Sequence, residues 1–184
     1  MRAKCKTKKV FNENDFKSGD GMLTSVWGPS LWHSLHTISF NYPMKPTKEE
    51  QKEYYNFIMS LRHILPCIYC RNNFVKNIKA IKFSMKSMKN RETFSRAIYD
   101  LHEEVNCVLG KKSNLTYEKV RDRYEIFRAR CLMNKKKTKK KSKKEDGCTN
   151  PLYGVKSKCV IKIVPKTKKC DTFSIEDRCI PTRN

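Results

Sequence analysis

The chain has 184 residues and a mass of 21.7 kDa, which is the length of one ordinary domain with extensions. It carries 41 Lys and Arg against 18 Asp and Glu, a formal net charge of +23, and its mean hydropathy is −0.75. These values argue against a membrane-embedded protein, because no apolar run approaches the roughly 20 residues that span a bilayer. Residues 1–6 are basic but are followed by Phe-Asn-Glu-Asn-Asp, so we expect no secretory signal peptide and a cytoplasmic location.

Nine cysteines are unexpected in that compartment, because a reducing cytosol favours catalytic or metal-binding uses of Cys over structural disulfides. Nine is an odd number. At least one thiol must therefore be free, paired with another chain, or a metal ligand.

The charge divides the chain near residue 134. Residues 1–134 hold 25 basic and 13 acidic side chains, and residues 135–184 hold 16 and 5. The lysine run 135–144 cannot bury enough apolar area to offset its ordering entropy, so it predicts an exposed, disordered linker. We therefore expect a basic arm over 1–22, a folded domain over 23–133, and a Lys-rich linker with a Cys-containing, largely disordered tail over 134–184.

The folded domain has helical periodicity throughout. Leu31, Leu35 and Ile38 recur at helical spacing in the first predicted helix. A capping box of Thr47 and Glu50 begins the second, which must end near Pro66.

A short helix is predicted over 67–78, and the next has an apolar stripe from Phe94 to Val108 and ends at Gly110. A last helix is predicted from about Thr116 to Arg130. The tail contains one strand-like run, 160–164. The fold class is therefore all-α, an antiparallel four-helix bundle with a short fifth helix.

The sharpest local feature is Pro66-Cys67-Ile68-Tyr69-Cys70, a C-x-x-C at a predicted helix start. Two buried core thiols or half of a zinc site would have the same pattern. Zinc needs two further ligands at comparable spacing, and the tail cysteines 148, 159, 170 and 179 contain no second C-x-x-C. Arg71 stands where a haem attachment motif requires His. A helix N-terminus lowers the pKa of a thiol and favours the thiolate that attacks disulfides, so a redox pair is the third interpretation.

Three further motifs accompany the C-x-x-C: Trp-Gly-Pro-Ser-Leu-Trp-His-Ser-Leu-His over 27–36, Tyr-Pro at 42–43, and Leu-His-Glu-Glu-Val-Asn-Cys-Val-Leu-Gly-Lys over 101–111. In this order and approximate spacing they resemble the Erv/ALR family of FAD-linked sulfhydryl oxidases over about residues 24–131. The opening motif looks most like the branch encoded by large cytoplasmic DNA viruses, which would explain disulfide chemistry without a secretory signal and implies the host cytoplasm or the virion.

The resemblance implies that Cys70 delivers electrons to FAD and that Cys67 exchanges with a protein dithiol, with O2 as the final acceptor and H2O2 as the product. It implies no metal ligands. The positions that it assigns to FAD are Gly28, Trp32, His36, Tyr42, His102, Val105, Asn106, Leu109, Lys111 and Tyr124. It also implies a homodimer through the first helices.

Two departures from the family pattern stand out. Glu103 replaces the Asn that usually follows the motif histidine, which adds a carboxylate close to the expected cofactor site. Thr116 breaks a structural disulfide of many relatives, so its expected partner Cys131 is left to pair elsewhere, for example with Cys107, or to stay reduced. A mobile pair that feeds the C-x-x-C is common in the family, and the candidates here are Cys5 and the four tail cysteines.

Two function classes compete. The first is an FAD-dependent thiol oxidase that forms disulfides in substrate proteins. The second is a basic module without enzymatic activity, in which cysteines bind zinc and lysines bind nucleic acid. In either case the lysine run would attract nucleic acid or an acidic surface without sequence preference.

Overall fold

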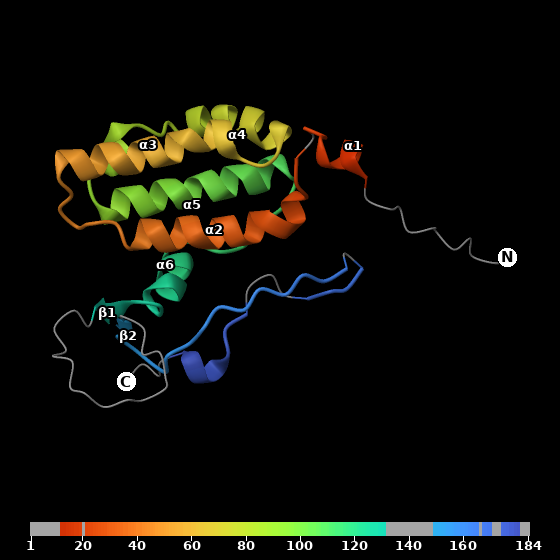
Figure 1. Cartoon of the computed structure of the whole chain (residues 1–184). Helices are drawn as coiled ribbons and strands as arrows, with labels where there is room; N and C mark the ends of the chain where they lie inside the picture. The colour runs from red at the N-terminus through yellow and green to blue at the C-terminus, as the bar shows by residue number, and fades with distance from the viewer. Residues whose placement is uncertain (1–11, 20, 132–148, 166, 171–173, 181–184) are drawn as a thin grey trace, which may run out of the picture.

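The computed structural model describes residues 12–19, 21–131, 149–165, 167–170 and 174–180. Its centre is a bundle of four helices, which are α2 (Thr24–Phe40), α3 (Lys48–Ile64), α4 (Ile68–Ala80) and α5 (Arg91–Val108). Figure 1 shows α3 and α4 on one side of α5 and α2 on the other, with the short helix α6 (Tyr117–Glu125) beside α2. The predicted all-α bundle with a short fifth helix is confirmed.

The helix boundaries follow the capping signals of the sequence. Thr47 Oγ1 accepts the N–H of Glu50 at 3.1 Å, and the Glu50 carboxylate accepts the N–H of Thr47 at 2.7 Å, so the predicted capping box begins α3. Asn90 caps α5 by accepting the N–H of Thr93. α5 ends just before Gly110, whose φ of +65° lies in the left-handed region that favours glycine.

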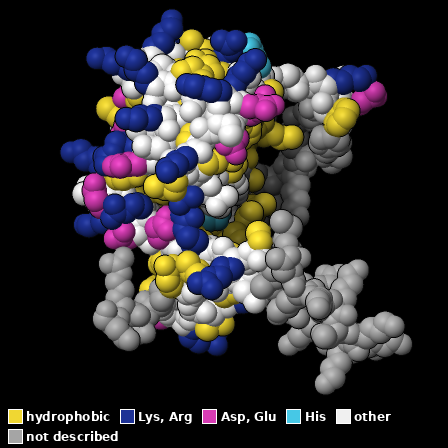
Figure 2. Space-filling view, turned by 90° about the vertical axis from the view of Figure 1, so that its left-hand side faces the viewer, with side chains coloured by type: hydrophobic (Ala, Val, Ile, Leu, Met, Phe, Trp, Pro, Cys, Tyr) yellow, Lys and Arg dark blue, Asp and Glu magenta, His cyan; other side chains and the backbone are white. Residues whose placement is uncertain are grey.

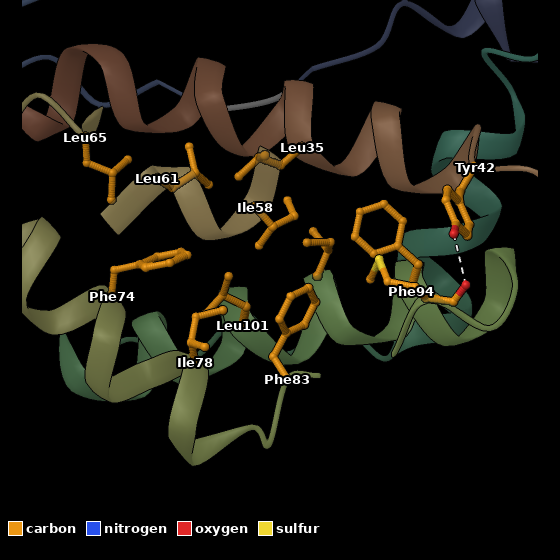
Figure 3. Packing of buried hydrophobic residues seen from close by; sticks show 12 residues of the cluster. Leu35, Tyr42, Ile58, Leu61, Leu65, Phe74, Ile78, Phe83, Phe94 and Leu101 are labelled. Carbon is orange, nitrogen blue, oxygen red and sulfur yellow. Dashed lines mark hydrogen bonds between the residues drawn. The ribbon is translucent and has the colours of Figure 1, made fainter. Parts of the chain in front are cut away.

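A hydrophobic core fills the space between the four helices (Figure 3). Ile58 of α3, Phe94 and Ile98 of α5, and Met88 of the 3-10 turn Met85–Met88 have no exposed surface. The stripes that predicted the helices supply this core. Burial of these apolar side chains is the main stabilising contribution to the bundle.

A smaller cluster attaches α6 to the bundle. Tyr117 and Val120 of α6 pack against Phe40 at the end of α2. The hydroxyl of Tyr117 forms a buried hydrogen bond of 2.8 Å with Ser95 Oγ on α5, and the hydroxyl of Tyr99 donates to the Leu115 carbonyl at 2.7 Å. Neighbouring helices therefore hold both the helix and the loop before it.

The structure differs from the sequence-based prediction after residue 125. α6 ends at Glu125, five residues earlier than expected, and β1 (Ala129–Cys131) pairs antiparallel with β2 (Thr149–Pro151). Arg128 donates to the Glu125 carboxylate and to the Phe40 carbonyl, while its own carbonyl accepts the N–H of Leu152. The backbone at Arg128 is thus hydrogen-bonded to the tail and cannot continue the helix.

The predicted strand at 160–164 is wrong: this run has no regular secondary structure. Its apolar side chains Val160, Ile161 and Ile163 are exposed. The other short elements are α1 (Glu13–Phe16) and a 3-10 turn, Asp177–Cys179. The lysine run 135–144, Cys5 and Cys148 lie outside the described residues. In the part of the chain that the structure covers, no helix is both long and apolar enough to cross a membrane.

Candidate active site

The two cysteines of the C-x-x-C lie at the start of α4 in different environments. Cys67 is the N-cap of the helix, with extended backbone (φ −160°, ψ 123°), and its Sγ accepts the N–H of Cys70 at 3.3 Å. Both residues are free thiols and both are half-buried, but only Cys70 packs against the core cluster. The sequence placed the pair correctly at a helix N-terminus.

These environments separate the acidities of the two thiols. The pKa of Cys67 is lowered by the Cys70 thiol, by the backbone N–H groups of Cys70 and Tyr69, and by the charge of Arg71. The pKa of Cys70 is raised to about 11 by burial and then by the neighbouring Cys67. Cys67 is therefore the member of the pair that exists more readily as a thiolate, and a thiol of lower pKa is also released faster from a disulfide.

Arg71 is a site residue that the sequence analysis did not assign. Its guanidinium donates to the Leu65 carbonyl at 2.6 Å, immediately before Pro66 and Cys67. It therefore braces the turn that presents the pair and places a positive charge beside it. Its position directly after Cys70, in the first turn of the helix, was the available signal.

A cluster of aromatic and histidine rings lies between α2 and α5. The ring of Trp32 stacks on that of His102, with centroids 4.0 Å apart and an interplanar angle of 5°. His36 Nε2 lies 3.0 Å from His102 Nδ1. Trp32 and His36 stand on successive turns of α2, and His102 of α5 lies 66 positions after His36. The structure thus brings all three together.

The two histidines of this cluster are neutral at physiological pH. Burial, together with its histidine neighbours, lowers the pKa of His36 to about 3. Burial also lowers the pKa of His102 to about 4, with Lys111 acting in the same direction and Glu103 opposing it. His36 Nδ1 is buried and has no hydrogen-bond partner among the described residues. A buried polar atom without a partner costs about 1–3 kcal/mol, so this atom is available to a bound group.

Tyr124 of α6 joins the cluster from the other side. Its ring lies 5.2 Å from that of His36 and 5.4 Å from that of Phe40, and burial raises the pKa of Tyr124 to about 12. Its hydroxyl is 3.3 Å from His33 Nδ1. His33 is a second residue that the sequence analysis did not assign, although it stands one helical turn from His36.

The C-terminal end of α5 forms an apolar rim with a basic edge. Val105 and Asn106 are half-buried, Leu109 is 59% exposed, and Lys111 is exposed with its N–H bonded to the Asn106 carbonyl at 2.8 Å. Glu103, the unusual carboxylate, accepts from Asn106 Nδ2 at 3.0 Å and from Ser113 Oγ at 2.9 Å. The carboxylate therefore orients Asn106 and anchors the following loop.

Two of the residues predicted to bind FAD, Gly28 and Tyr42, lie outside the cluster of aromatic and histidine rings. Gly28, inside α2, has no heavy atom within 4 Å of where a Cβ would stand, apart from its chain neighbours and the backbone of its own helix, so this side of the helix is open among the described residues. Tyr42 has no exposed surface, packs edge-on against Tyr54 and Phe94, and donates its hydroxyl to the Met88 carbonyl at 2.9 Å (Figure 3). The structure places Tyr42 in the core and does not bring it to the histidine cluster.

The other thiols of the described chain are separate. Cys107 and Cys131 are exposed and free, so the disulfide considered between them is absent, and Cys159, Cys170 and Cys179 are also free thiols. Over the same described residues, no group of three or more His, Cys, Asp or Glu side chains is arranged to hold a metal ion.

The fold and this site define a class: a helical bundle that carries two thiols of different pKa at a helix start and a cluster of aromatic and histidine rings between two of its helices. A model of the Erv1 / Alr family matches residues 29–125, and the chain belongs to this family.

Relatives and solved structures agree with that membership. The "Probable FAD-linked sulfhydryl oxidase" of Acanthamoeba polyphaga mimivirus is 34% identical over 96 residues, which are 52% of this chain and 66% of that protein. The mitochondrial FAD-linked sulfhydryl oxidase ERV1 of Saccharomyces cerevisiae is 32% identical over 84 residues, 46% of this chain and 43% of that protein. The chain therefore spans less than two thirds of the length of either relative. The crystal structure of the FAD binding domain of Erv1 from Saccharomyces cerevisiae superposes with a TM-score of 0.51 at 28% identity, over 56% of this chain and 94% of that one.

Proposed function

We propose that this protein is an FAD-linked sulfhydryl oxidase that forms disulfide bonds in substrate proteins. The observation that carries the proposal is the thiol pair at the start of α4, in which Cys67, of lowered pKa, stands beside a core-facing Cys70 of raised pKa. Cys70 and Trp32 both pack against the hydrophobic core between the helices. The relatives named as FAD-linked sulfhydryl oxidases support the same activity.

The residues of the ring cluster fit a flavin. The unpartnered Nδ1 of His36 offers a hydrogen bond, and the half-buried Trp32 offers a flat ring surface. Val108 and Leu109 are 54% and 59% exposed, which is the apolar surface that a tricyclic ring would cover. Lys111 and Lys112, both exposed, can neutralise a pyrophosphate. We therefore assign the cofactor to the positions predicted from the sequence, with Tyr42 as a support of the bundle.

The chain's own residues perform the exchange of thiols and disulfides. In the oxidised pair, a substrate thiolate attacks Cys67 Sγ, and the Cys67–Cys70 bond breaks with its electron pair leaving on Cys70. A second substrate thiolate then attacks the substrate sulfur of the mixed disulfide and releases Cys67 as a thiolate, which the helix N-terminus and Arg71 stabilise. When bound, the flavin supplies the two-electron chemistry that reoxidises the pair and reduces O2 to H2O2.

The competing proposal is a zinc-binding, nucleic-acid-binding module. The described residues offer it no group of three metal-ligating side chains. On the face shown in Figure 2, Lys and Arg stand among Asp and Glu and do not form a single basic patch. These observations favour the oxidase for the folded part of the chain.

Oxygen consumption and colour test the proposal. The purified protein should be yellow and should consume O2 when a reduced protein dithiol is added. Cys70→Ser should keep the colour and lose O2 consumption, whereas the matched control Cys107→Ser, an exposed thiol on the same bundle, should keep both. A colourless protein that releases zinc on acidification would refute the oxidase, and a yellow Cys70→Ser variant with full turnover would refute the role of the pair.

The finer assignments rest on the sequence and are part of the same proposal. We assign the oxidase domain to residues 23–133, the arm to 1–22 and the linker and tail to 134–184. A homodimer, contacts of the lysine run with acidic or nucleic-acid partners, and a cytoplasmic or virion location complete it. Light scattering on the purified protein tests the dimer, which predicts twice the chain mass of 21.7 kDa.

A further inference from the structure

The segment before α2 is hydrogen-bonded to the backbone of the thiol pair. Gly21 and Cys67 form an isolated antiparallel bridge, and the N–H of Met22 donates to the Pro66 carbonyl at 2.7 Å. The indole N–H of Trp27 donates to the Met22 carbonyl at 3.0 Å and so ties the segment back to α2. Two residues far from α4 in sequence therefore contact the redox motif through backbone atoms.

Only glycine fits at the point of contact. The φ of Gly21 is +106°, in the region that side-chain-bearing residues rarely adopt. A Cβ there would stand 2.6 Å from the Pro66 carbonyl oxygen and 3.1 Å from Cys67 Cα, and both are backbone atoms that cannot rotate away. Any substitution must push the segment off the turn or push the turn itself.

The bridge fixes the backbone conformation on which the thiol geometry depends. Cys67 is extended, and this conformation allows its Sγ to accept the N–H of Cys70 as an N-cap does. The Pro66–Cys67 turn is thus held from both sides, by Arg71 on the Leu65 carbonyl and by Met22 on the Pro66 carbonyl.

We infer that Gly21 is a positioning residue for the redox pair: its close backbone contact holds Cys67 in the N-cap geometry, in which the Cys67 sulfur accepts the N–H of Cys70. The inference rests on the proposed function only in taking Cys67 as the thiol that exchanges with substrate.

The groups that set the acidity of Cys67 lie on α4 and not on the segment before α2. The charged and titratable neighbours on α4 are Tyr69, Cys70 and Arg71, and Arg62 and His63 stand at the end of α3. Residues 21–32 contain no titratable side chain. The segment therefore influences Cys67 through backbone geometry, and a substitution at position 21 changes no charge.

Alkylation of the reduced full chain at pH 6 to 10 tests the inference, with fragment-ion mass spectrometry to separate Cys67 from Cys70. The variant is Gly21→Ala. The matched control is Gly19→Ala, because apart from its chain neighbours no heavy atom of the described residues lies within 4 Å of a Cβ at that position. We expect the pKa of Cys67 to rise by about one unit in Gly21→Ala, so that its alkylation at pH 7 slows about tenfold, with no change in Gly19→Ala.

A pKa of Cys67 in folded Gly21→Ala equal to that in Gly19→Ala would overturn the inference. If circular dichroism finds Gly21→Ala unfolded, the same alkylation measurement is made on Trp27→Phe. This variant removes the N–H donor to the Met22 carbonyl, which ties the segment to α2, without adding an atom at position 21. A rise of the Cys67 pKa in Trp27→Phe supports the inference, and an unchanged pKa overturns it. A wild-type protein without O2 consumption would count against the proposed function and leave this alkylation test unaffected.

Discussion

The hydrogen-bonded pair of the buried His36 and the half-buried His102 should lower the stability of the protein in mild acid. Both side chains are neutral in the folded protein, with pKa values lowered to about 3 and about 4, whereas an unfolded histidine has its ordinary value of 6.5. Below pH 6.5 the unfolded state therefore binds protons that the folded state does not, and the free energy of unfolding falls as the pH falls. Above that pH the two states carry the same charge on these rings, and the effect is absent.

The expected magnitude follows from the two shifts. Between pH 7 and pH 5 each histidine removes about 2 kcal/mol from the free energy of unfolding, or about 4 kcal/mol for the pair as an upper value. Most carboxylates have their ordinary pKa near 4 and hardly titrate in this window. The histidines should therefore dominate the loss.

Urea unfolding at pH 7 and pH 5, followed by circular dichroism, measures this difference. The double variant His36→Gln, His102→Gln removes the titrating pair, and His63→Gln at the exposed end of α3 is the matched control. We expect the loss of stability between pH 7 and pH 5 to shrink by about 2–4 kcal/mol in the double variant only. Equal losses in the wild type and the double variant would refute the reasoning.

Three substitutions test the contacts that hold the bundle. Phe94→Ala empties a site with no exposed surface and should lower the free energy of unfolding by about 3–5 kcal/mol. Tyr117→Phe removes the buried hydrogen bond to Ser95 and should cost about 1 kcal/mol, measured by denaturant unfolding. Thr47→Ala removes half of the capping box with Glu50 and should cost about 1 kcal/mol.

Each of these three substitutions has a control substitution at an exposed position. Met44→Ala, Tyr69→Phe and Lys48→Ala alter exposed side chains and should each leave stability within about 0.5 kcal/mol of the wild type. A loss in Phe94→Ala no larger than that in Met44→Ala would contradict the assigned core. Equal stability of Tyr117→Phe and Tyr69→Phe, or of Thr47→Ala and Lys48→Ala, would contradict the corresponding hydrogen bonds.

Local signals account for what was correctly predicted about the helices. The capping box at Thr47, the proline before Cys67 and the glycine at 110 mark helix ends through contacts within a few residues, so the sequence contains them in full. The helix from Thr116 was predicted too long because its end depends on Arg128. This residue is held by Phe40, 88 positions away, and by the tail at Leu152.

The sequence by itself therefore determined the helices, the position of the thiol pair at a helix start and, through the order of its motifs, the family. Only the tertiary structure decided which side chains meet: that Tyr42 is buried in the core, that Tyr124 lies against His33 and His36, and that Gly21 touches Cys67. The physical reason is the separation in sequence over which each kind of interaction acts. Helix capping and periodicity act over one or two turns, whereas these contacts form only after packing has brought distant segments to within hydrogen-bonding distance.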